Sequence, residues 1–175
     1  MSESSQRRHP NVLNVSEVEA REFKQGQIGN RGRALGRAAG GAALGCAYME
    51  LEPGYTSYPY HFHSSLEEAL YVLEGQGTMR IGPDEVAVGA GDYVAFPVGP
   101  EHAHTLKNSG NQVLRYLVLS APCTPVTLDV IGYPDSKKVA FSSGVTAPGK
   151  SWFRKMIKED APSLDYFEDE PLAKE

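Results

Sequence analysis

The chain has 175 residues, of which 41% are hydrophobic and 22% are charged, and its formal net charge is −5 at pH 7. This length and balance predict a single soluble globular domain whose core needs no disulfide or structural metal. No apolar segment approaches about 18 residues, so we exclude a membrane span, and no basic face is evident, so we exclude a nucleic-acid partner. Since no N-terminal run resembles a signal peptide, we expect a cytoplasmic protein.

Residues 1–43 are expected to form an N-terminal arm and edge segment outside the main core. Residues 1–10 are polar and are expected to fray, whereas the apolar residues of 12–15 predict a short strand. The Ser-x-x-Glu spacing at 16–19 is that of a capping box and predicts a helical turn. Residues 26–45 are rich in Gly, Ala and Arg, and we interpret them as loop and edge structure that leads into the first core strand.

Between residues 44 and 120, short apolar segments alternate with turns of Gly, Pro and Asn at intervals of roughly eight to twelve residues. This spacing, without a convincing helical pattern, predicts an all-β domain folded as an antiparallel sandwich or barrel. We therefore take 44–120 as the barrel core. The expected strands are residues 44–51, 70–73, 78–81, 86–88, 93–96, 102–106 and 113–120.

Residues 121–175 are expected to belong to the same domain, as outer strands followed by an acidic C-terminal extension. Residues 126–131 and 139–141 predict the outer strands. The apolar residues of 151–158 follow an i, i+1, i+4, i+5 pattern that favours a helix, and a strand with an exposed basic edge is the alternative. Residues 158–175 carry seven acidic and two basic side chains, so the whole net charge lies in this tail.

Two histidines, His61 and His63, lie two residues apart just before an apolar run. On a strand, residues i and i+2 point to the same face, so both imidazoles can converge on one ion, whereas on a helix they would point roughly 200° apart. Pro59 before them and the Val, Leu and Tyr residues after them favour the strand. Because an exposed His-x-His on a strand is more often without function, further ligands are needed to indicate a metal site.

Further candidate ligands follow at strand-scale intervals. Counting back by twos from Val72 places Glu68 on the inward face of its strand and Glu67 on the outward face. His102 and His104 share one face of a later strand by the same alternation. A set of three imidazoles and one carboxylate suits Mn, Fe, Co, Ni, Cu or Zn, because imidazole is a borderline ligand that all of these metals accept.

These residues resemble the two sequence motifs of the cupin superfamily, over about residues 44–120. The part similar to the first motif reads Gly54-x6-His61-x-His63-x4-Glu68-x6-Gly75. The part similar to the second motif reads Gly91-x5-Pro97-x-Gly99, followed by His104-x3-Asn108. The segments Glu67–Gly75 and Tyr133–Lys137 most resemble small single-domain bacterial cupins that are likened to phosphosugar isomerases.

The chain departs from the family pattern in two places. Gly54 is one residue further from the first histidine than is usual, and the position three residues after the Gly of the second motif is His102. The His-x3-Asn spacing instead selects His104, and we choose His104 because the strand through Leu106 to Asn108 then keeps the family's alternation. A turn lengthened by two residues explains the mismatch, and His102 becomes a candidate for supporting a ligand or transferring a proton.

The resemblance implies a double-stranded β-helix, or jelly roll, with a metal near the barrel centre held by His61, His63, Glu68 and His104. The metal implied is a divalent transition ion, Zn, Mn, Fe or Ni. The resemblance also implies a homodimer whose N-terminal segments cross over, and a small-molecule ligand.

Two classes of function fit this site. The first is a metalloenzyme on a small polar molecule, either an isomerase that uses the metal as a Lewis acid or an Fe-dependent dioxygenase. The second is a non-enzymatic module that binds a small ligand or a metal. If Glu68 is a ligand, an enzyme needs a base from elsewhere, and the candidates are His102, Tyr60 and Tyr48. A serine or cysteine hydrolase is poorly supported, since the chain has no GxSxG motif and neither cysteine lies in the two motifs.

Overall fold

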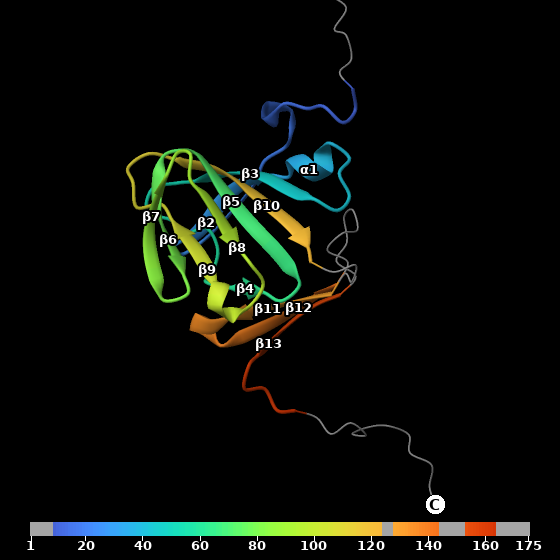
Figure 1. Cartoon of the computed structure of the whole chain (residues 1–175), viewed down its shortest axis with the longest axis vertical. Helices are drawn as coiled ribbons and strands as arrows, with labels where there is room; N and C mark the ends of the chain where they lie inside the picture. Colours follow the sequence, from blue (N-terminus) through green and yellow to red (C-terminus); the bar gives the residue numbers. More distant parts are fainter. Residues whose placement is uncertain (1–8, 124–127, 144–152, 164–175) are drawn as a thin grey trace, which may run out of the picture.

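The computed structural model describes residues 9–123, 128–143 and 153–163, and these residues form thirteen β-strands and one short α-helix (Figure 1). The largest sheet has six antiparallel strands in the order β1 (Arg21–Gln25), β2 (Ile28–Arg33), β3 (Gly45–Leu51), β10 (Leu114–Pro122), β5 (Leu66–Glu74) and β8 (Tyr93–Phe96). A three-stranded sheet has the order β7 (Asp84–Gly89), β6 (Gln76–Ile81) and β9 (His104–Lys107). A four-stranded sheet has the order β13 (Phe153–Lys158), β12 (Lys138–Ser143), β11 (Leu128–Tyr133) and β4 (Phe62–His63).

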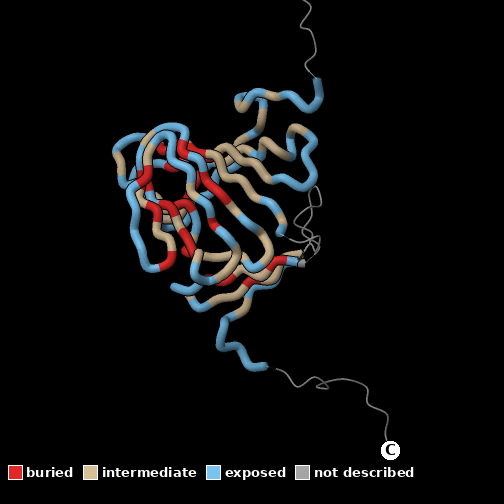
Figure 2. Tube along the Cα trace, in the orientation of Figure 1, coloured by how far each residue is buried: buried red, intermediate tan, exposed pale blue. Residues whose placement is uncertain are grey.

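The core lies between the six-stranded and the three-stranded sheets, where the inward side chains of alternate residues meet. Leu70 and Val72 on β5 are 3% and 0% exposed, whereas Tyr71 between them is 38% exposed. In Figure 2, most of the buried residues lie in the strands of the barrel. The all-β class and the jelly-roll arrangement expected from the sequence are therefore confirmed.

The four-stranded sheet lies across one end of this barrel, at the bottom of the view in Figure 1. It is joined to the barrel through β4, where His63 pairs with Ile131 and Phe62 pairs with Gly132. A further bridge between His61 and His104 ties the residue before β4 to the start of β9. Strand β11 is thus held directly against the segment that carries the His-x-His.

Four local predictions need correction. Residues 12–15 are not a strand, and the capping box is formed two residues earlier, where Asn14 and Glu17 cap a 3-10 turn at Val15–Glu17. The segment 26–45 is more ordered than expected, because it contains β2 and the helix α1 (Leu35–Ala38). The segment 153–158 is the strand β13, not a helix, because its backbone pairs with β12. The acidic residues after 163 lie outside the described part of the chain.

Helix α1 has four residues, and within the described ranges no helix is long and apolar enough to cross a bilayer.

Four glycines of the two motifs have positive φ angles: Gly54, Gly75, Gly91 and Gly99. At Gly75, φ is +87° and a Cβ atom would lie 3.0 Å from the Cα of Leu114. A side chain is disfavoured there both by the backbone conformation and by the close approach of β10. The glycine therefore allows β5 to turn into β6 while packing tightly against its neighbour.

Asn108 fixes the end of β9 to two other segments. Its side chain is fully buried, and its Nδ2 donates to the carbonyl oxygens of Leu51 (2.7 Å) and Gln112 (2.8 Å). Its Oδ1 accepts from the amide of Gly110 at 3.0 Å, and its own carbonyl accepts from the amide of Gly54 at 2.9 Å. Asn108 therefore acts as a structural clamp that holds the end of β9, the strand that begins with His104.

Candidate metal centre

The four predicted ligands come from three different strands. His61 lies directly before β4, His63 ends β4, Glu68 is on the inward face of β5 and His104 begins β9. The backbones of His61 and His104 exchange two hydrogen bonds, of 3.1 and 2.8 Å, which hold these two side chains next to each other. Their ring centroids are 4.8 Å apart.

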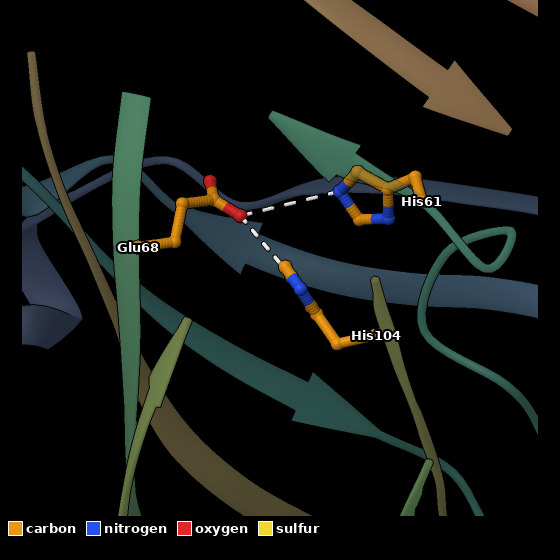
Figure 3. Close-up of side chains that lie close together, drawn as sticks. All are labelled: His61, Glu68 and His104. Carbon is orange, nitrogen blue, oxygen red and sulfur yellow. Dashed lines mark ion pairs between the residues drawn. The ribbon is translucent and has the colours of Figure 1, made fainter. Parts of the chain in front are cut away.

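The three imidazoles converge on one carboxylate oxygen. Glu68 Oε2 lies 4.0 Å from His61 Nε2, 3.5 Å from His63 Nε2 and 3.4 Å from His104 Nε2. Ligand atoms of His61, Glu68 and His104 all lie within 4.8 Å of one another. Figure 3 shows that these three side chains point toward one another. All four side chains are largely buried, so the polar atoms gather at a single point inside the barrel.

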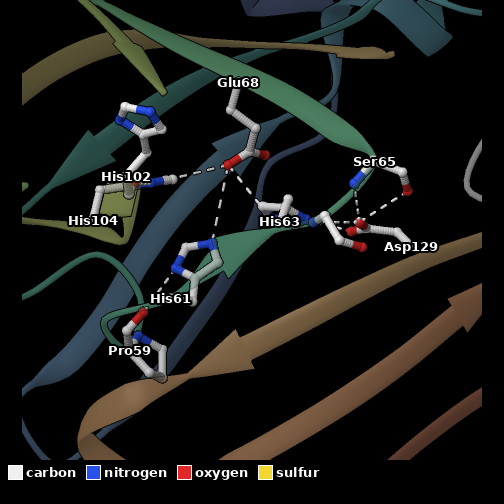
Figure 4. A network of polar contacts seen from close by, with 9 residues as sticks. Pro59, His61, His63, Ser65, Glu68, His102, His104 and Asp129 are labelled. Atoms are coloured by element: carbon white, nitrogen blue, oxygen red, sulfur yellow. Dashed lines mark hydrogen bonds and ion pairs between the residues drawn. The ribbon is translucent and has the colours of Figure 1, made fainter. Parts of the chain in front are cut away.

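The other ring nitrogen of each histidine is occupied. His61 Nδ1 lies 2.8 Å from the carbonyl oxygen of Pro59, and His104 Nδ1 lies 3.0 Å from that of His102. Since a carbonyl oxygen only accepts, these Nδ1 atoms carry the hydrogen and leave Nε2 as the nitrogen available to an ion. His63 Nδ1 is hydrogen-bonded to the carboxylate of Asp129, with the same consequence (Figure 4). The donor set therefore fits a divalent transition metal.

Ring packing restricts two of the imidazoles further. Phe96 stacks on His104 with a centroid distance of 3.7 Å and an interplanar angle of 11°. Tyr133 stacks on His61 at 6.0 Å and 22°. The two rings are therefore held in orientation by hydrogen bonds and by apolar contacts.

Burial and the neighbouring charges shift the pKa values of the site in different directions. Burial lowers the pKa of His61 to about 4, so this ring is neutral at pH 7. Burial alone would lower the pKa of His63, but the hydrogen bond to Asp129 and the charge of Glu68 outweigh it and raise the pKa above its usual value. Burial alone would raise the pKa of Glu68, but its contacts with His104, His63 and His61 lower it. Glu68 is therefore ionised, as a metal ligand must be.

A cavity of about 280 Å³ adjoins these ligands. Most of its wall is apolar, and the side chains come from both barrel sheets and from the four-stranded sheet. Residues of the latter that line it include Ile131, Tyr133 and Arg154. Among the described lining residues, Arg154 is the only Lys or Arg.

The proposed bases do not lie at this cavity. His102 belongs to a 3-10 turn at Pro100–His102 and not to the expected strand, which begins at His104, and its Nε2 lies 3.7 Å from Glu101 Oε1. Tyr60 donates its hydroxyl to the carbonyl of Gly82 at 2.9 Å and is not among the lining residues. Tyr48 points to the outer face of β3, since Ala47 and Met49 on either side of it line the cavity.

Sequence reasoning missed three residues at the site: Asp129, Tyr133 and Arg154. They lie on β11 and β13, outside both motifs. No local spacing links them to the histidines, because they reach the site only through the pairing of β11 with β4 and of β12 with β11 and β13.

Comparison with known proteins agrees with this geometry. Residues 47–120 match the family model Cupin_2, described as a cupin domain. An uncharacterized protein of Methanocaldococcus jannaschii is 37% identical over 62 residues, which are 35% of this chain and 48% of that protein. The chain therefore spans about half the length of this curated relative.

Two crystal structures are similar over most of the chain. A provisionally named sugar phosphate isomerase from Acidithiobacillus ferrooxidans is 26% identical, with a TM-score of 0.75 over 89% of this chain and 97% of that chain. A sugar phosphate isomerase of the cupin superfamily from Silicibacter pomeroyi is 22% identical, with a TM-score of 0.73 over the same shares. The second likeness supports the fold alone. Residues 47–120 thus match a cupin domain, and the strand order and the converging ligands agree with this match.

Proposed function

We propose that the protein binds one divalent transition metal through His61, His63, Glu68 and His104 and acts as an isomerase on a small polar molecule. The observation that carries this proposal is the convergence of three Nε2 atoms on Glu68 Oε2, with every Nδ1 atom already bonded elsewhere. The metal, when bound, supplies a Lewis acid that makes the C–H bond next to a substrate carbonyl more acidic. The similarity to the Acidithiobacillus ferrooxidans structure, provisionally named a sugar phosphate isomerase, supports this reaction type.

The chain's own residues bind and orient the substrate beside the ligands. The apolar wall, including Leu70, Met79 and Phe96, limits the access of water to the ligand atoms. Tyr58 also lines the cavity, and burial raises the pKa of its hydroxyl, which therefore stays protonated and can donate a hydrogen bond to a substrate oxygen. Arg154 supplies a cation that suits a phosphate or carboxylate group.

The reaction is tested with metal-loaded protein and a panel of aldose and ketose phosphates. Protein loaded with Mn²⁺, Fe²⁺, Ni²⁺ or Zn²⁺ is expected to interconvert one such pair and to exchange the hydrogen next to the carbonyl with deuterated water. Matched sugars without phosphate serve as controls for the contribution of Arg154. Neither turnover nor exchange with any of the four metals would argue strongly against an isomerase.

A substitution at Arg154 tests the proposed anion contact. Arg154→Gln is expected to raise the KM for a phosphorylated substrate about tenfold with little change in kcat, because an exposed arginine binds the ground state and the transition state alike. Lys155→Gln is the matched control, since Lys155 is the next residue of the same strand and does not line the cavity. Equal effects of the two substitutions would show that only general charge matters.

Two other functions are compatible with the same ligands. The predominantly apolar wall favours a less polar substrate, and with iron in the site the protein would then act as a dioxygenase, which oxygen uptake would reveal. A non-enzymatic cupin is the remaining alternative. A ligand that raises the melting temperature without being consumed would support this binding role.

We also propose that the protein is a homodimer. On the outer face of the largest sheet, neighbouring strands place Tyr48, Leu117, Tyr71 and Tyr93 in one row. Tyr71 and Tyr93 are 38% and 61% exposed, and such an apolar row favours contact with a second copy. Light scattering is expected to give twice the mass of the 19.0 kDa chain, and a monomer at all concentrations would contradict the proposal.

A further inference from the structure

Asp129 is the most extensively bonded carboxylate near the proposed ligands. It lies on β11 and is 3% exposed. Its Oδ1 accepts from the amide of Ser64 at 3.2 Å, from the amide of Ser65 at 3.1 Å and from the Ser65 hydroxyl at 3.2 Å. Its Oδ2 is hydrogen-bonded to Nδ1 of His63 (Figure 4). Both carboxylate oxygens are thus fixed, and one of them faces a proposed ligand.

The residues that follow β4 hold the backbone of β11 at this point. The Ser64 amide donates to the carbonyl of Val130 at 3.0 Å, and the Val130 amide donates to the Ser64 hydroxyl at 3.0 Å. The Ser65 hydroxyl lies 2.5 Å from the carbonyl oxygen of Leu128. These contacts set the position of Asp129 relative to His63 without using the carboxylate itself.

His63 differs from the other two histidines in how its Nδ1 is bonded. His61 and His104 each use the carbonyl oxygen of the residue two positions earlier, which is a neutral and local acceptor. His63 uses a side-chain carboxylate 66 residues further along the chain. A carboxylate on Nδ1 both fixes the ring orientation and makes Nε2 a stronger donor to a cation.

We infer that Asp129 is a positioning residue that holds His63 in the tautomer and orientation in which Nε2 faces the metal. The inference rests on the proposed metal centre and extends it, because β11 lies outside the segment 47–120 that matches the cupin family. The four-stranded sheet then contributes to the metal centre, since its strand β11 carries the residue that orients His63. The competing reading is that Asp129 only anchors Ser64 and Ser65 to β11.

Asp129→Asn separates the two readings. The asparagine oxygen can still accept from Ser64 and Ser65, whereas its NH₂ group faces His63 Nδ1 and favours the tautomer with the hydrogen on Nε2. We expect metal affinity, measured by competition with a chelator, to fall about 10–100-fold. The ¹⁵N signals of the His63 ring in metal-free protein are expected to change from the Nδ1–H to the Nε2–H form, while the metal-free melting temperature changes little.

Ser65→Ala is the matched control. It removes the hydroxyl that contacts Asp129 and Leu128 but leaves the bond between Asp129 and His63 in place. Its metal affinity and its His63 tautomer are expected to equal those of the wild type. An unchanged tautomer and affinity in Asp129→Asn, or an equal loss of affinity in Ser65→Ala, would overturn the inference. If wild-type protein binds no metal, the proposed centre fails by itself, and the His63 tautomer in the two variants still decides whether Asp129 orients this ring.

Discussion

His104→Ala protein is expected to be purified without metal, whereas His102→Ala protein is expected to retain it. His104 contributes an Nε2 that lies 3.4 Å from Glu68 Oε2, while the His102 side chain lies in the preceding turn beside Glu101. Removing a ligand should cost more than the roughly 10–100-fold loss typical of a residue that only supports one. Elemental analysis of protein made without a histidine tag measures the result.

His61→Ala serves as the second ligand variant and should lose the metal as completely as His104→Ala. His102→Ala is the matched control, because it removes an imidazole two residues away without touching the cluster. Loss of the metal in His102→Ala together with its retention in His104→Ala would reverse the choice between the two histidines. The ligand set proposed for β9 would then be wrong.

Asn108→Ala is expected to lower the free energy of unfolding by about 3 kcal/mol, the largest stability effect that we predict for a single polar side chain. The substitution removes the hydrogen bonds to Leu51, Gly110 and Gln112 and leaves the carbonyl of Leu51 buried without its side-chain donor. Urea unfolding of metal-free protein followed by circular dichroism measures the change.

Asn111→Ala is the matched control for this experiment, because Asn111 is exposed and lies in the same turn. We expect its unfolding free energy to stay within about 0.5 kcal/mol of the wild type. If Asn108→Ala is no less stable than Asn111→Ala, the asparagine of the second motif is not the clamp described above.

Most of the barrel could be predicted from the sequence because period-2 alternation and turn residues act locally. Counting by twos along β5 correctly placed Glu68 inward and Glu67 outward. The four motif glycines also have a physical explanation, since each has a positive φ angle that other residues rarely adopt. Local rules were thus sufficient wherever the backbone itself determines the direction of the side chain.

The same local rules failed where contacts between segments distant in the sequence determine the structure. The apolar pattern of 151–158 favoured a helix, and only the pairing of β13 with β12 shows that residues 153–158 form a strand. His102 looked like a strand residue, but the sequence from Gly99 to Pro100 favours a turn, with φ +120° at the glycine and Pro at the start of the 3-10 segment. Asp129 carries no motif, and its role follows only from the contact between β11 and β4.

The central claim is that one metal ion binds between three imidazoles and one carboxylate. A crystal structure of protein soaked with Mn²⁺ or Zn²⁺, with anomalous scattering recorded at the metal edge, tests it most directly. We predict one peak per chain within about 2.0–2.3 Å of the Nε2 atoms of His61, His63 and His104 and of a Glu68 oxygen. A metal that lies beyond bonding distance of any two of these four ligands, or that is bound beside His102, would contradict the account.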